Sequence, residues 1–377
     1  MSHRVVVGCM TGTSLDGIDA AIVEIHGRGL AMQARFIAGA SRPLGTCAAA
    51  LRRLADQQPI TSGEIATALH EFAAPHVAAI QEAIRANGAA SNTANLSLDL
   101  ICVHGQTVYH KPPVSWQAMQ PAPIARAFGV PVVFDLRAAD LAAGGQGAPI
   151  TPLADAVLFG DPSSARAVLN LGGFANFTVL PAAAAQSPHT IRGGDICACN
   201  QLLDAVARTA LGAAFDDGGA IASSGSPDAA LLTQLTDILA RQSSGGRSLG
   251  TGDELMDWVA AHASAAPATL AATATHAIAK TISQRLRDEC DRAGVTALDA
   301  VIVAGGSVRH RPLMDAIARG TGARVVTSEA FGVPAAFREA ACFAVLGALC
   351  QDRVPITLPQ VTGCAERAPV SGTWCGV

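Results

Sequence analysis

The chain has 377 residues, of which 50% are hydrophobic and 15% charged, and its formal net charge is −4 at pH 7. This length allows two domains with sizeable cores, and this composition excludes an intrinsically disordered chain. The small negative charge gives no general attraction to nucleic acid or to anionic membranes. No apolar run of about 18 residues predicts a membrane span. Because the first residues enter a predicted strand without a signal-peptide pattern, we expect a cytoplasmic protein.

The first predicted elements form a strand–loop–strand unit. Apolar strands are expected at residues 4–8 and 20–25, and the segment 11–19 between them is rich in Gly, Thr and Ser. Such a tight hairpin directs backbone N–H groups and hydroxyls into one concavity that suits a phosphate. Asp16 and Asp19 would repel a phosphate, so they are candidate Mg²⁺ ligands or a candidate base. The alternative is an ordinary hairpin that turns at Asp16.

Helical patterns follow in the first half of the chain. Apolar residues recur at helical spacing over 51–55 and 65–86, and the polar residues 87–95 predict a loop. A buried strand is expected at 98–103. The polar segment 104–112 comes at the carboxyl end of this strand, where α/β sheets place ligands. The remaining predictions of this half are a helix at 122–129, a strand at 130–134, the charged residues Asp135, Arg137 and Asp140, and a glycine loop at 144–147.

The second half opens with another strand–turn–strand unit. Strands are expected at 165–171 and 174–180, with Gly172 and Gly173 as the turn. Asp195 follows two glycines and precedes a predicted helix, so it is a helix-capping residue or a carboxylate that the helix dipole keeps ionised. The other predictions of this half are helices at 200–211, 270–290, from Pro312 and at 339–349, a mobile Gly- and Ser-rich stretch at 216–250, a strand at 299–303 that ends at 305–307, and an aperiodic tail at 360–377.

Two such units, each opening about half of the chain, predict a duplicated two-lobed fold with a ligand between the lobes. One glycine hairpin alone favours an ordinary turn, whereas two of them favour nucleotide binding. Strands that alternate with helices indicate α/β sheets, and the absence of GxxxxGK[ST] argues against a P-loop enzyme. We expect an N-terminal lobe at 1–160 and a C-terminal lobe at 161–377. A return of the last helix to the first lobe is the alternative.

Six sequence segments resemble one known family. They are GTSLDGID at 12–19, HGQTVYHKP at 104–112, AAGGQGAP at 142–149, LNLGGFAN at 169–176, GVPAAFREAACFA at 332–344 and LPQVTG at 358–363. Over almost the whole chain they are similar to anhydro-N-acetylmuramic acid kinases, of the actin, sugar-kinase and heat-shock-protein superfamily. The resemblance implies a two-lobed actin-like (ribonuclease H-like) ATPase fold, with duplicated mixed-sheet domains and a cleft between them. It also implies a homodimer.

The resemblance further implies an ATP-dependent kinase of cell-wall (peptidoglycan) recycling. Water, deprotonated by a carboxylate, would attack the anomeric carbon of 1,6-anhydro-N-acetylmuramic acid, and the bridge oxygen would take the γ-phosphoryl group. The product would be N-acetylmuramic acid 6-phosphate. Mg²⁺ is expected beside ATP because phosphoryl transfer needs its charge neutralised. The expected partner is this small amino sugar, with no nucleic acid and no membrane.

Site roles are carried onto this chain by the same resemblance. Asp195 would be the catalytic base, and Glu339 would lie near the sugar. The nucleotide contacts would be Gly12, Thr13, Ser14, Leu15, Asp16, Gly17, Ile18, Asp19, Gly172, Gly173, Asn176, Gly305 and Gly306, with Asp16 and Asp19 as metal ligands. The substrate contacts would be His104, Gln106, Arg137, Asp140 and Asn200, with Arg137 pairing the lactyl carboxylate in bidentate geometry.

Structural roles compete with three of these assignments. Glu339 is also predicted to lie in the first turn of a helix, where the helix dipole favours an acidic side chain. Arg137 has Asp135 and Asp140 nearby as alternative ion-pair partners. A lone histidine at the end of a strand, such as His104, is more often structural than functional.

The chain departs from the family pattern close to the predicted base. The family follows its aspartate with Thr-Gly-Pro-Gly-Asn, whereas residues 196–200 read Ile-Cys-Ala-Cys-Asn, and Ser307 replaces a third glycine. The cysteines form no CxxC pair, and reduced thiols that fill small core spaces are the expected state. Two alternatives to the family reaction remain: a kinase of another small sugar or acid, and a non-catalytic ATP-binding relative. Retention of Asp16, Asp19 and Asp195, together with Asn200, argues against the non-catalytic relative.

Overall fold

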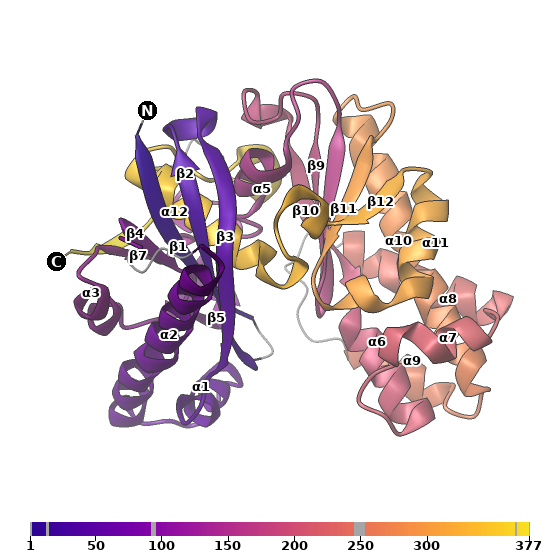
Figure 1. The fold of residues 1–377 in the computed structure, drawn as a ribbon. Helices are drawn as coiled ribbons and strands as arrows, with labels where there is room; N and C mark the ends of the chain where they lie inside the picture. The colour runs from indigo at the N-terminus through magenta and orange to yellow at the C-terminus, as the bar shows by residue number, and fades with distance from the viewer. Residues whose placement is uncertain (1, 13–14, 92–95, 245–252, 366–367, 377) are drawn as a thin grey trace. The chain divides into compact units, whose positions relative to one another are not determined.

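The computed structural model describes residues 2–12, 15–91, 96–244, 253–365 and 368–376. The chain divides into two compact units (Figure 1). Unit 1 comprises Met1–Phe159, Ala185–His189 and Phe331–Val377, and unit 2 comprises Gly160–Ala184 and Thr190–Ala330. The last helix of the chain therefore belongs to the same unit as the N-terminus.

Unit 1 is built on a six-stranded mixed sheet with the strand order β13-β7-β4-β1-β2-β3. Strands β1, β2 and β3 form an antiparallel meander, and β4 and β7 continue from β1 in parallel. The strands are β1 (His3–Thr11), β2 (Gly17–His26), β3 (Gln33–Pro43), β4 (Leu100–Val103), β7 (Val132–Phe134) and β13 (Thr373–Cys375). A separate hairpin pairs β5 (Gln106–Lys111) with β6 (Val114–Ala118).

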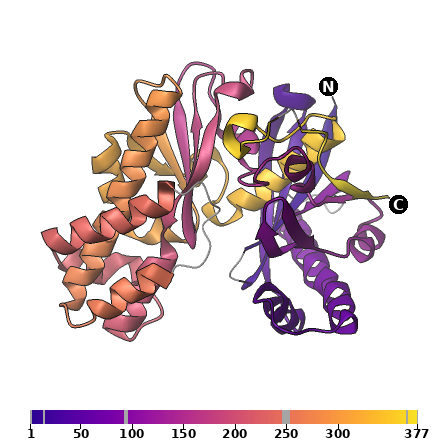
Figure 2. The same ribbon diagram turned by 180° about the vertical axis from the view of Figure 1, so that it is seen from behind.

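Helices cover both faces of this sheet (Figures 1 and 2). Side chains alternate along β1, so Val5, Val7 and Cys9 pack in one core with Phe72 of the long helix α2. Gly8 faces the other way, where a Cβ would overlap the carbonyl oxygen of Ala340, so α12 packs directly on the strand backbone. The helices of this unit are α1 (Cys47–Ala55), α2 (Ser62–Ser91), α3 (Ala122–Phe128), α4 (Ala138–Ala142), α5 (Pro152–Phe159), α12 (Arg338–Gln351) and α13 (Pro359–Thr362).

Unit 2 contains a five-stranded mixed sheet with the order β10-β9-β8-β11-β12. Leu169 and Leu171 of β8 pack with Ile278 and Ile282 of the long helix α10 in the core of this unit. The strands are β8 (Arg166–Leu171), β9 (Phe174–Leu180), β10 (Arg192–Ala198), β11 (Ala300–Ala304) and β12 (Arg324–Thr327). The helices are α6 (Asn200–Val206), α7 (Ala220–Ser224), α8 (Ala229–Ser244), α9 (Asp253–Ala261), α10 (Pro267–Arg292) and α11 (Arg311–Thr321), and a π-helical turn, η3 (Ala207–Leu211), continues α6.

The two sheets repeat one arrangement. In each, a three-stranded antiparallel meander is followed by two strands parallel to its first strand, in the orders β3-β2-β1-β4-β7 and β10-β9-β8-β11-β12. Each meander begins with one of the predicted glycine hairpins. This is the ribonuclease H-like sheet in duplicate, so the predicted actin-like α/β fold with mixed-sheet domains is confirmed.

Several local predictions were wrong or incomplete. Helix α2 continues to Ser91, so the loop predicted from Asn87 is not present over residues 87–91. Most of the stretch predicted to be mobile is helical, since it holds α7 and α8, while residues 245–252 lie outside the described part. The third strand of each meander, β3 or β10, was not predicted, nor were the edge strands β12 and β13. These strands lack a strong apolar alternation and depend on pairing with neighbours distant in sequence.

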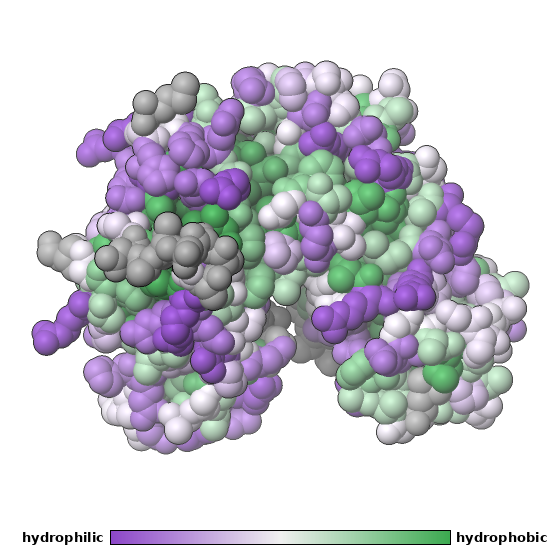
Figure 3. Space-filling model, viewed as in Figure 1, coloured by the Kyte–Doolittle hydropathy of each residue, from purple (hydrophilic) through white to green (hydrophobic). Residues whose placement is uncertain are grey.

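The outer surface of the helices is mixed in character. Figure 3 shows hydrophilic and hydrophobic residues interspersed over α1 and α2, as expected for helices that bury one face only. Among the described residues, no helix has both the length and the apolar character that crossing a bilayer requires.

The buried His76 on α2 predicts an acid-sensitive stability. Its side chain is 0% exposed, its Nδ1 donates to the carbonyl oxygen of Phe72 at 2.8 Å, and burial lowers its pKa to about 4. The unfolded chain binds a proton here below about pH 6.5, and the folded chain binds it only near pH 4. The free energy of unfolding therefore falls as the pH drops between these values, by about 3 kcal/mol from this group.

Urea denaturation at pH 6.5, 5 and 4 tests this expectation. The variant His76→Leu should lose less stability over this range than the wild type. His70, which is exposed on the same helix, supplies the matched control His70→Leu, which should follow the wild-type pH dependence. Parallel pH curves for His76→Leu and the wild type would contradict the assignment.

Candidate active site

In unit 1 the start of the first glycine loop lies beside the polar segment that follows β4. The Thr11 hydroxyl donates to the carbonyl oxygen of Gly105 at 3.1 Å, and Gln106 Nε2 donates to that of Gly12 at 3.4 Å. Strands β1 and β4 are parallel neighbours, so their carboxyl ends meet at one edge of the sheet. The structure thus brings Gln106, a predicted substrate contact, to Gly12, a predicted phosphate contact.

The buried His104 pairs with the half-buried Arg137 in the same region. Arg137 Nη2 lies 3.0 Å from His104 Nε2, and its Nη1 donates to the carbonyl oxygen of Gly147 at 2.7 Å. Burial and then the Arg137 charge lower the pKa of His104 to about 3. A guanidinium only donates hydrogen bonds, so Nε2 accepts and the neutral ring carries its proton on Nδ1. Phe343 packs against this ring with 5.0 Å between centroids.

Asp140 is a structural anchor in this structure. It is 0% exposed, and its two carboxylate oxygens accept hydrogen bonds from the backbone N–H of Gly147 at 2.6 Å and the hydroxyl of Thr362 at 2.6 Å. A Cβ on Gly145 would overlap this carboxylate, so only glycine fits there. Asp140 therefore fixes the loop that also supports Arg137. Its predicted substrate contact stays a prediction.

The acidic residues of the first loop differ in environment. Asp16 is exposed and Asp19 is half-buried. Burial raises the pKa of Asp19, a hydrogen bond from Ser41 opposes this rise, and the Asp16 charge adds to it. The Ser41 hydroxyl donates to Asp19 Oδ1 at 2.5 Å. Because the two carboxylates repel each other, a bound cation would stabilise both charges, and this donor set fits Mg²⁺.

Three other predicted nucleotide contacts of this loop, Leu15, Gly17 and Ile18, lie where the core or the strand takes up part of the residue. Leu15 is buried and has a φ of 57°, a left-handed conformation that is uncommon for a residue with a side chain. Gly17 and Ile18 are the first residues of β2, and Ile18 is 0% exposed. Its side chain therefore belongs to the core, and only its backbone is available to a ligand. Thr13 and Ser14 lie outside the described residues.

Glu339 is the second residue of α12 and is half-buried. It follows Arg338, which pairs with Asp155 of α5, and precedes Ala340, which packs against Gly8 of β1. This is the first-turn position that favours an acidic residue. The role near the sugar stays a prediction.

In unit 2 the second glycine turn supports the start of α6. The carbonyl oxygen of Gly172 accepts from the backbone N–H of Asn200 at 3.0 Å, and that of Gly173 accepts from Cys199 at 2.8 Å. The Ser307 hydroxyl in turn donates to Asn200 Oδ1. Asn200 therefore connects the second hairpin to the glycine segment after β11.

Gly305 sits in a position that only glycine can fill. Its φ is 91°, and a Cβ there would lie 2.7 Å from the carbonyl oxygen of Leu171 and 2.8 Å from Asn170 Oδ1. The neighbouring Gly306 is exposed, and a Cβ on it would meet only Asn200 Nδ2, at 3.2 Å. Four predicted site residues, namely Gly172, Asn200, Gly305 and Gly306, are thus brought together within this unit.

The position of Asp195 corrects both sequence-based interpretations of it. Asp195 lies inside β10 opposite Asn176 of β9, and the ladder shifts register between Asp195 and Cys197. Helix α6 begins only at Asn200, with Cys199 as its N-cap residue. Asp195 is therefore neither a helix cap nor at a helix N-terminus. The ladder itself pairs Asp195 with Asn176, a predicted nucleotide contact, and the residue that the register shift leaves unpaired is Ile196.

The two cysteines after Asp195 are core residues. Cys197 and Cys199 are both 0% exposed, and burial raises the pKa of Cys199 to about 12. Its Sγ lies 3.8 Å from the hydroxyl of Ser307, so two of the departures from the family pattern touch each other. All ten cysteines are free thiols, as expected from the sequence. Buried thiols of raised pKa, such as those of Cys197 and Cys199, stay protonated, fill space and are poor nucleophiles.

A family model described as "Anhydro-N-acetylmuramic acid kinase" matches residues 4–374. The chain belongs to the anhydro-N-acetylmuramic acid kinase family. Relatives of that name are 36% identical in Salinibacter ruber, over 98% of this chain and 96% of the relative, and 36% in Burkholderia vietnamiensis, over 96% and 94%. The relative in Synechococcus sp. is 34% identical, over 96% and 97%. The family predicted from the six segments is confirmed.

One solved structure that matches this family member superposes on it only loosely. Component A of the (R)-2-hydroxyglutaryl-CoA dehydratase of Acidaminococcus fermentans aligns over 92% of this chain and 98% of its own, with 13% identity and a TM-score of 0.42. The fold assignment therefore rests on strand order and not on superposition.

Several residues that shape these clusters were not singled out from the sequence of this family member. They are Ser41, which contacts Asp19, Phe343, which packs on His104, and Thr362, which holds Asp140. Phe343 and Thr362 lie in the segments GVPAAFREAACFA and LPQVTG, so the family motifs contained the signal. Ser41 lies on β3, a strand that the sequence did not predict, and no local signal marks it.

Proposed function

We propose that this chain is an ATP-dependent kinase that opens 1,6-anhydro-N-acetylmuramic acid with water and phosphorylates O6. The observation that carries the proposal is the family match over residues 4–374. It is supported by the way each unit gathers its own candidate residues around one glycine hairpin. As a kinase the chain would use ATP, and we further propose Mg²⁺ and a homodimer.

The proposed reaction balances in one displacement and one transfer. Asp195 takes a proton from water, and the water oxygen attacks the anomeric carbon. The bond between that carbon and the bridge oxygen breaks, and the bridge oxygen takes the γ-phosphoryl group of ATP as ADP leaves. The products are N-acetylmuramic acid 6-phosphate, ADP and the proton held by Asp195. An ionised carboxylate within reach of the water is what such a general base requires.

Each group of residues has a part in this proposal. The backbone of the two glycine hairpins would contact the phosphates, with Gly305 and Gly306 near the adenosine. Asp16 and Asp19 would hold Mg²⁺, which neutralises phosphate charge when it is bound. Burial and the Arg137 charge keep His104 neutral, so its Nδ1–H can donate a hydrogen bond to a ligand without a change of charge between pH 5 and 9.

Sugar-dependent release of ADP tests the function. The purified chain is mixed with Mg-ATP, with and without the anhydro sugar, in heavy-oxygen water, and the sugar product is analysed by mass. We expect ADP only with the sugar, and a product heavier by one phosphate and one labelled water. A product without the labelled oxygen would indicate a plain hydroxyl kinase. Absence of sugar-dependent ADP from protein that binds ATP would reject the proposal.

Arg137 offers a prediction about substrate recognition. The variant Arg137→Lys keeps the charge but loses the planar fork that matches a carboxylate. We expect KM for the anhydro sugar to rise roughly 10- to 100-fold, the loss of one charge-assisted hydrogen-bonded contact. Because Arg137 also supports His104 and Gly147, the variant's Tm and its Kd for ATP are measured as controls for the fold.

The matched substrate for this test is 1,6-anhydro-N-acetylglucosamine, which lacks the lactyl group. If Arg137 pairs with the lactyl carboxylate, wild type and Arg137→Lys should handle this analogue with similar kcat/KM. An equal loss on both sugars would mean that Arg137 only positions His104 and the loop.

A further inference from the structure

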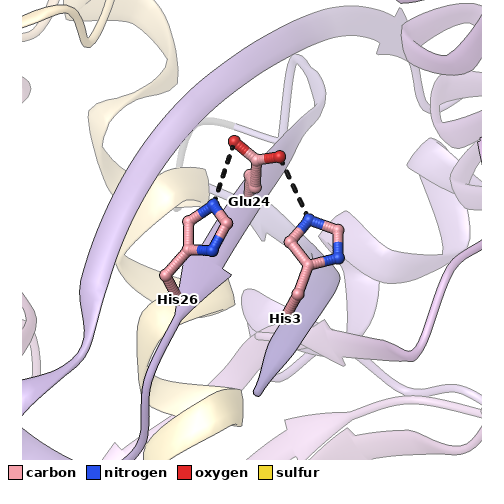
Figure 4. Close-up of side chains that lie close together, drawn as sticks. All are labelled: His3, Glu24 and His26. Atoms are coloured by element: carbon pink, nitrogen blue, oxygen red, sulfur yellow. Dashed lines mark hydrogen bonds and ion pairs between the residues drawn. The ribbon is translucent and has the colours of Figure 1, made fainter. Parts of the chain in front are cut away.

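Three side chains with metal-ligand chemistry meet on the first hairpin, at the end away from its glycine loop. His3 is the first residue of β1, and Glu24 and His26 lie near the end of β2. His3 Nε2 lies 3.0 Å from Glu24 Oε1, and His26 Nε2 lies 3.6 Å from Glu24 Oε2. Figure 4 shows both imidazole rings directed at the two oxygens of one carboxylate. None of the three residues has a part in the proposed reaction.

Strand geometry accounts for this convergence. His3 and His26 are direct partners in the antiparallel ladder, and Glu24 precedes His26 by two residues, so all three side chains lie on one face of the sheet. Arg35 of β3 is the direct partner of Glu24 on the same face. The positions are fixed by backbone pairing and do not depend on a loop.

We propose that His3, Glu24 and His26 bind a divalent ion of the Zn²⁺ class. Their ligand atoms all lie within 4.8 Å of one another. In a tetrahedral Zn²⁺ site with bonds of about 2.0 to 2.1 Å, ligand atoms lie about 3.3 Å apart. His3 Nε2 and His26 Nε2 lie 3.0 and 3.6 Å from the two different oxygens of Glu24, so each ring is close to this spacing from the carboxylate. Two imidazoles and one carboxylate suit Zn²⁺ better than Mg²⁺ or Ca²⁺, which favour oxygen ligands. Water would complete the coordination.

The exposure of the two histidines allows a metal ion to bind, but Arg35 already contacts Glu24. The side chains of His3 and His26 are 50% and 47% exposed, so an ion can reach them from solvent. Arg35 Nη2 lies 2.5 Å and its Nε 2.9 Å from Glu24 Oε2. The Arg35 side chain is 67% exposed, and an exposed ion pair of this kind contributes little to stability. The metal ion therefore competes with Arg35 for one oxygen of Glu24.

The bound ion would join two strands that also carry the first glycine loop. It would connect the start of β1 to the end of β2, whereas the loop connects the end of β1 to the start of β2. A ligand that binds only the folded state raises its stability. We therefore assign the site a stabilising role on this hairpin and no catalytic role.

Titration of Zn²⁺ into the untagged full chain, followed by calorimetry with Mg²⁺ in excess, tests the proposal. The excess Mg²⁺ occupies sites that prefer hard ions. We expect one Zn²⁺ per chain, a weakening of at least about tenfold in His3→Ala and in His26→Ala, and no change in His70→Ala. Circular dichroism and Tm in the presence of a chelator establish that each variant is folded. Wild-type affinity in either of the first two variants would overturn the proposal.

A second pair of variants tests the carboxylate separately from the imidazoles. Arg35→Ala removes the competitor, so Zn²⁺ should bind a few-fold more tightly. Glu24→Gln removes the charged ligand, so binding should weaken. Unspecific binding to exposed histidines would respond to neither change. An affinity unchanged in both variants would therefore overturn the three-ligand site.

Discussion

Replacing Asp195 by asparagine is expected to lower kcat by roughly 10²- to 10⁴-fold, the usual contribution of a general base. Asparagine keeps the size of the side chain but cannot accept the water proton. Asp195 lies in β10 next to a change of register, where the backbone is fixed on one side by β9. The substitution should therefore leave the Kd for ATP and the Tm nearly unchanged. Steady-state kinetics with the anhydro sugar and ATP binding by calorimetry measure the two effects.

The matched control is Asp237→Asn, which removes an exposed carboxylate from α8 in the same unit. It should retain wild-type kcat. If Asp195→Asn turned over substrate at a rate near that of the wild type, Asp195 would not be the base. A large loss of ATP affinity would instead assign it a role in binding the nucleotide.

Removing the carboxylate of Asp155 is expected to cost about 3 to 5 kcal/mol of unfolding free energy, because it leaves a buried guanidinium without its counter-charge. Asp155 and Arg338 are 0% and 2% exposed. Arg338 Nε donates to Asp155 Oδ1 at 2.9 Å, and its Nη2 pairs with Oδ2. This pair ties α5 to α12, the helix that packs on β1. Urea denaturation and Tm of Asp155→Ala at pH 7 measure the loss.

A double-mutant cycle measures the interaction energy between Asp155 and Arg338 separately from the loss of each side chain. The double variant Asp155→Leu with Arg338→Met replaces the pair by apolar side chains, so it should be more stable than either single variant. The partly exposed pair Arg42–Glu82, whose side chains are 42% and 39% exposed and whose Nε and Oε2 lie 2.5 Å apart, supplies the control Glu82→Ala, which should cost less than about 1 kcal/mol. A loss in Asp155→Ala as small as that of the control would show that the buried pair is not needed for stability.

Sequence motifs contain most of the residues that the structure brings together in each unit. Gly172, Asn200, Gly305 and Gly306 came from motifs and proved to lie together. The burial and the charge state of other residues could not be predicted from motifs. That His104 is neutral follows from its burial and from Arg137, a residue 33 positions later in the chain.

Local pattern determined the start of each half of this protein. Apolar runs that end in glycine-rich turns specify β1 with β2 and β8 with β9, because strand and turn preferences act over a few neighbouring residues. The family motifs extended this to the duplicated fold and to the candidate residues. The tertiary structure alone decided the third strand of each meander and the position of Asp195 on β10. It also decided the anchoring of Asp140 by Thr362. Register, burial and such contacts join residues far apart in the chain, so no local pattern encodes them.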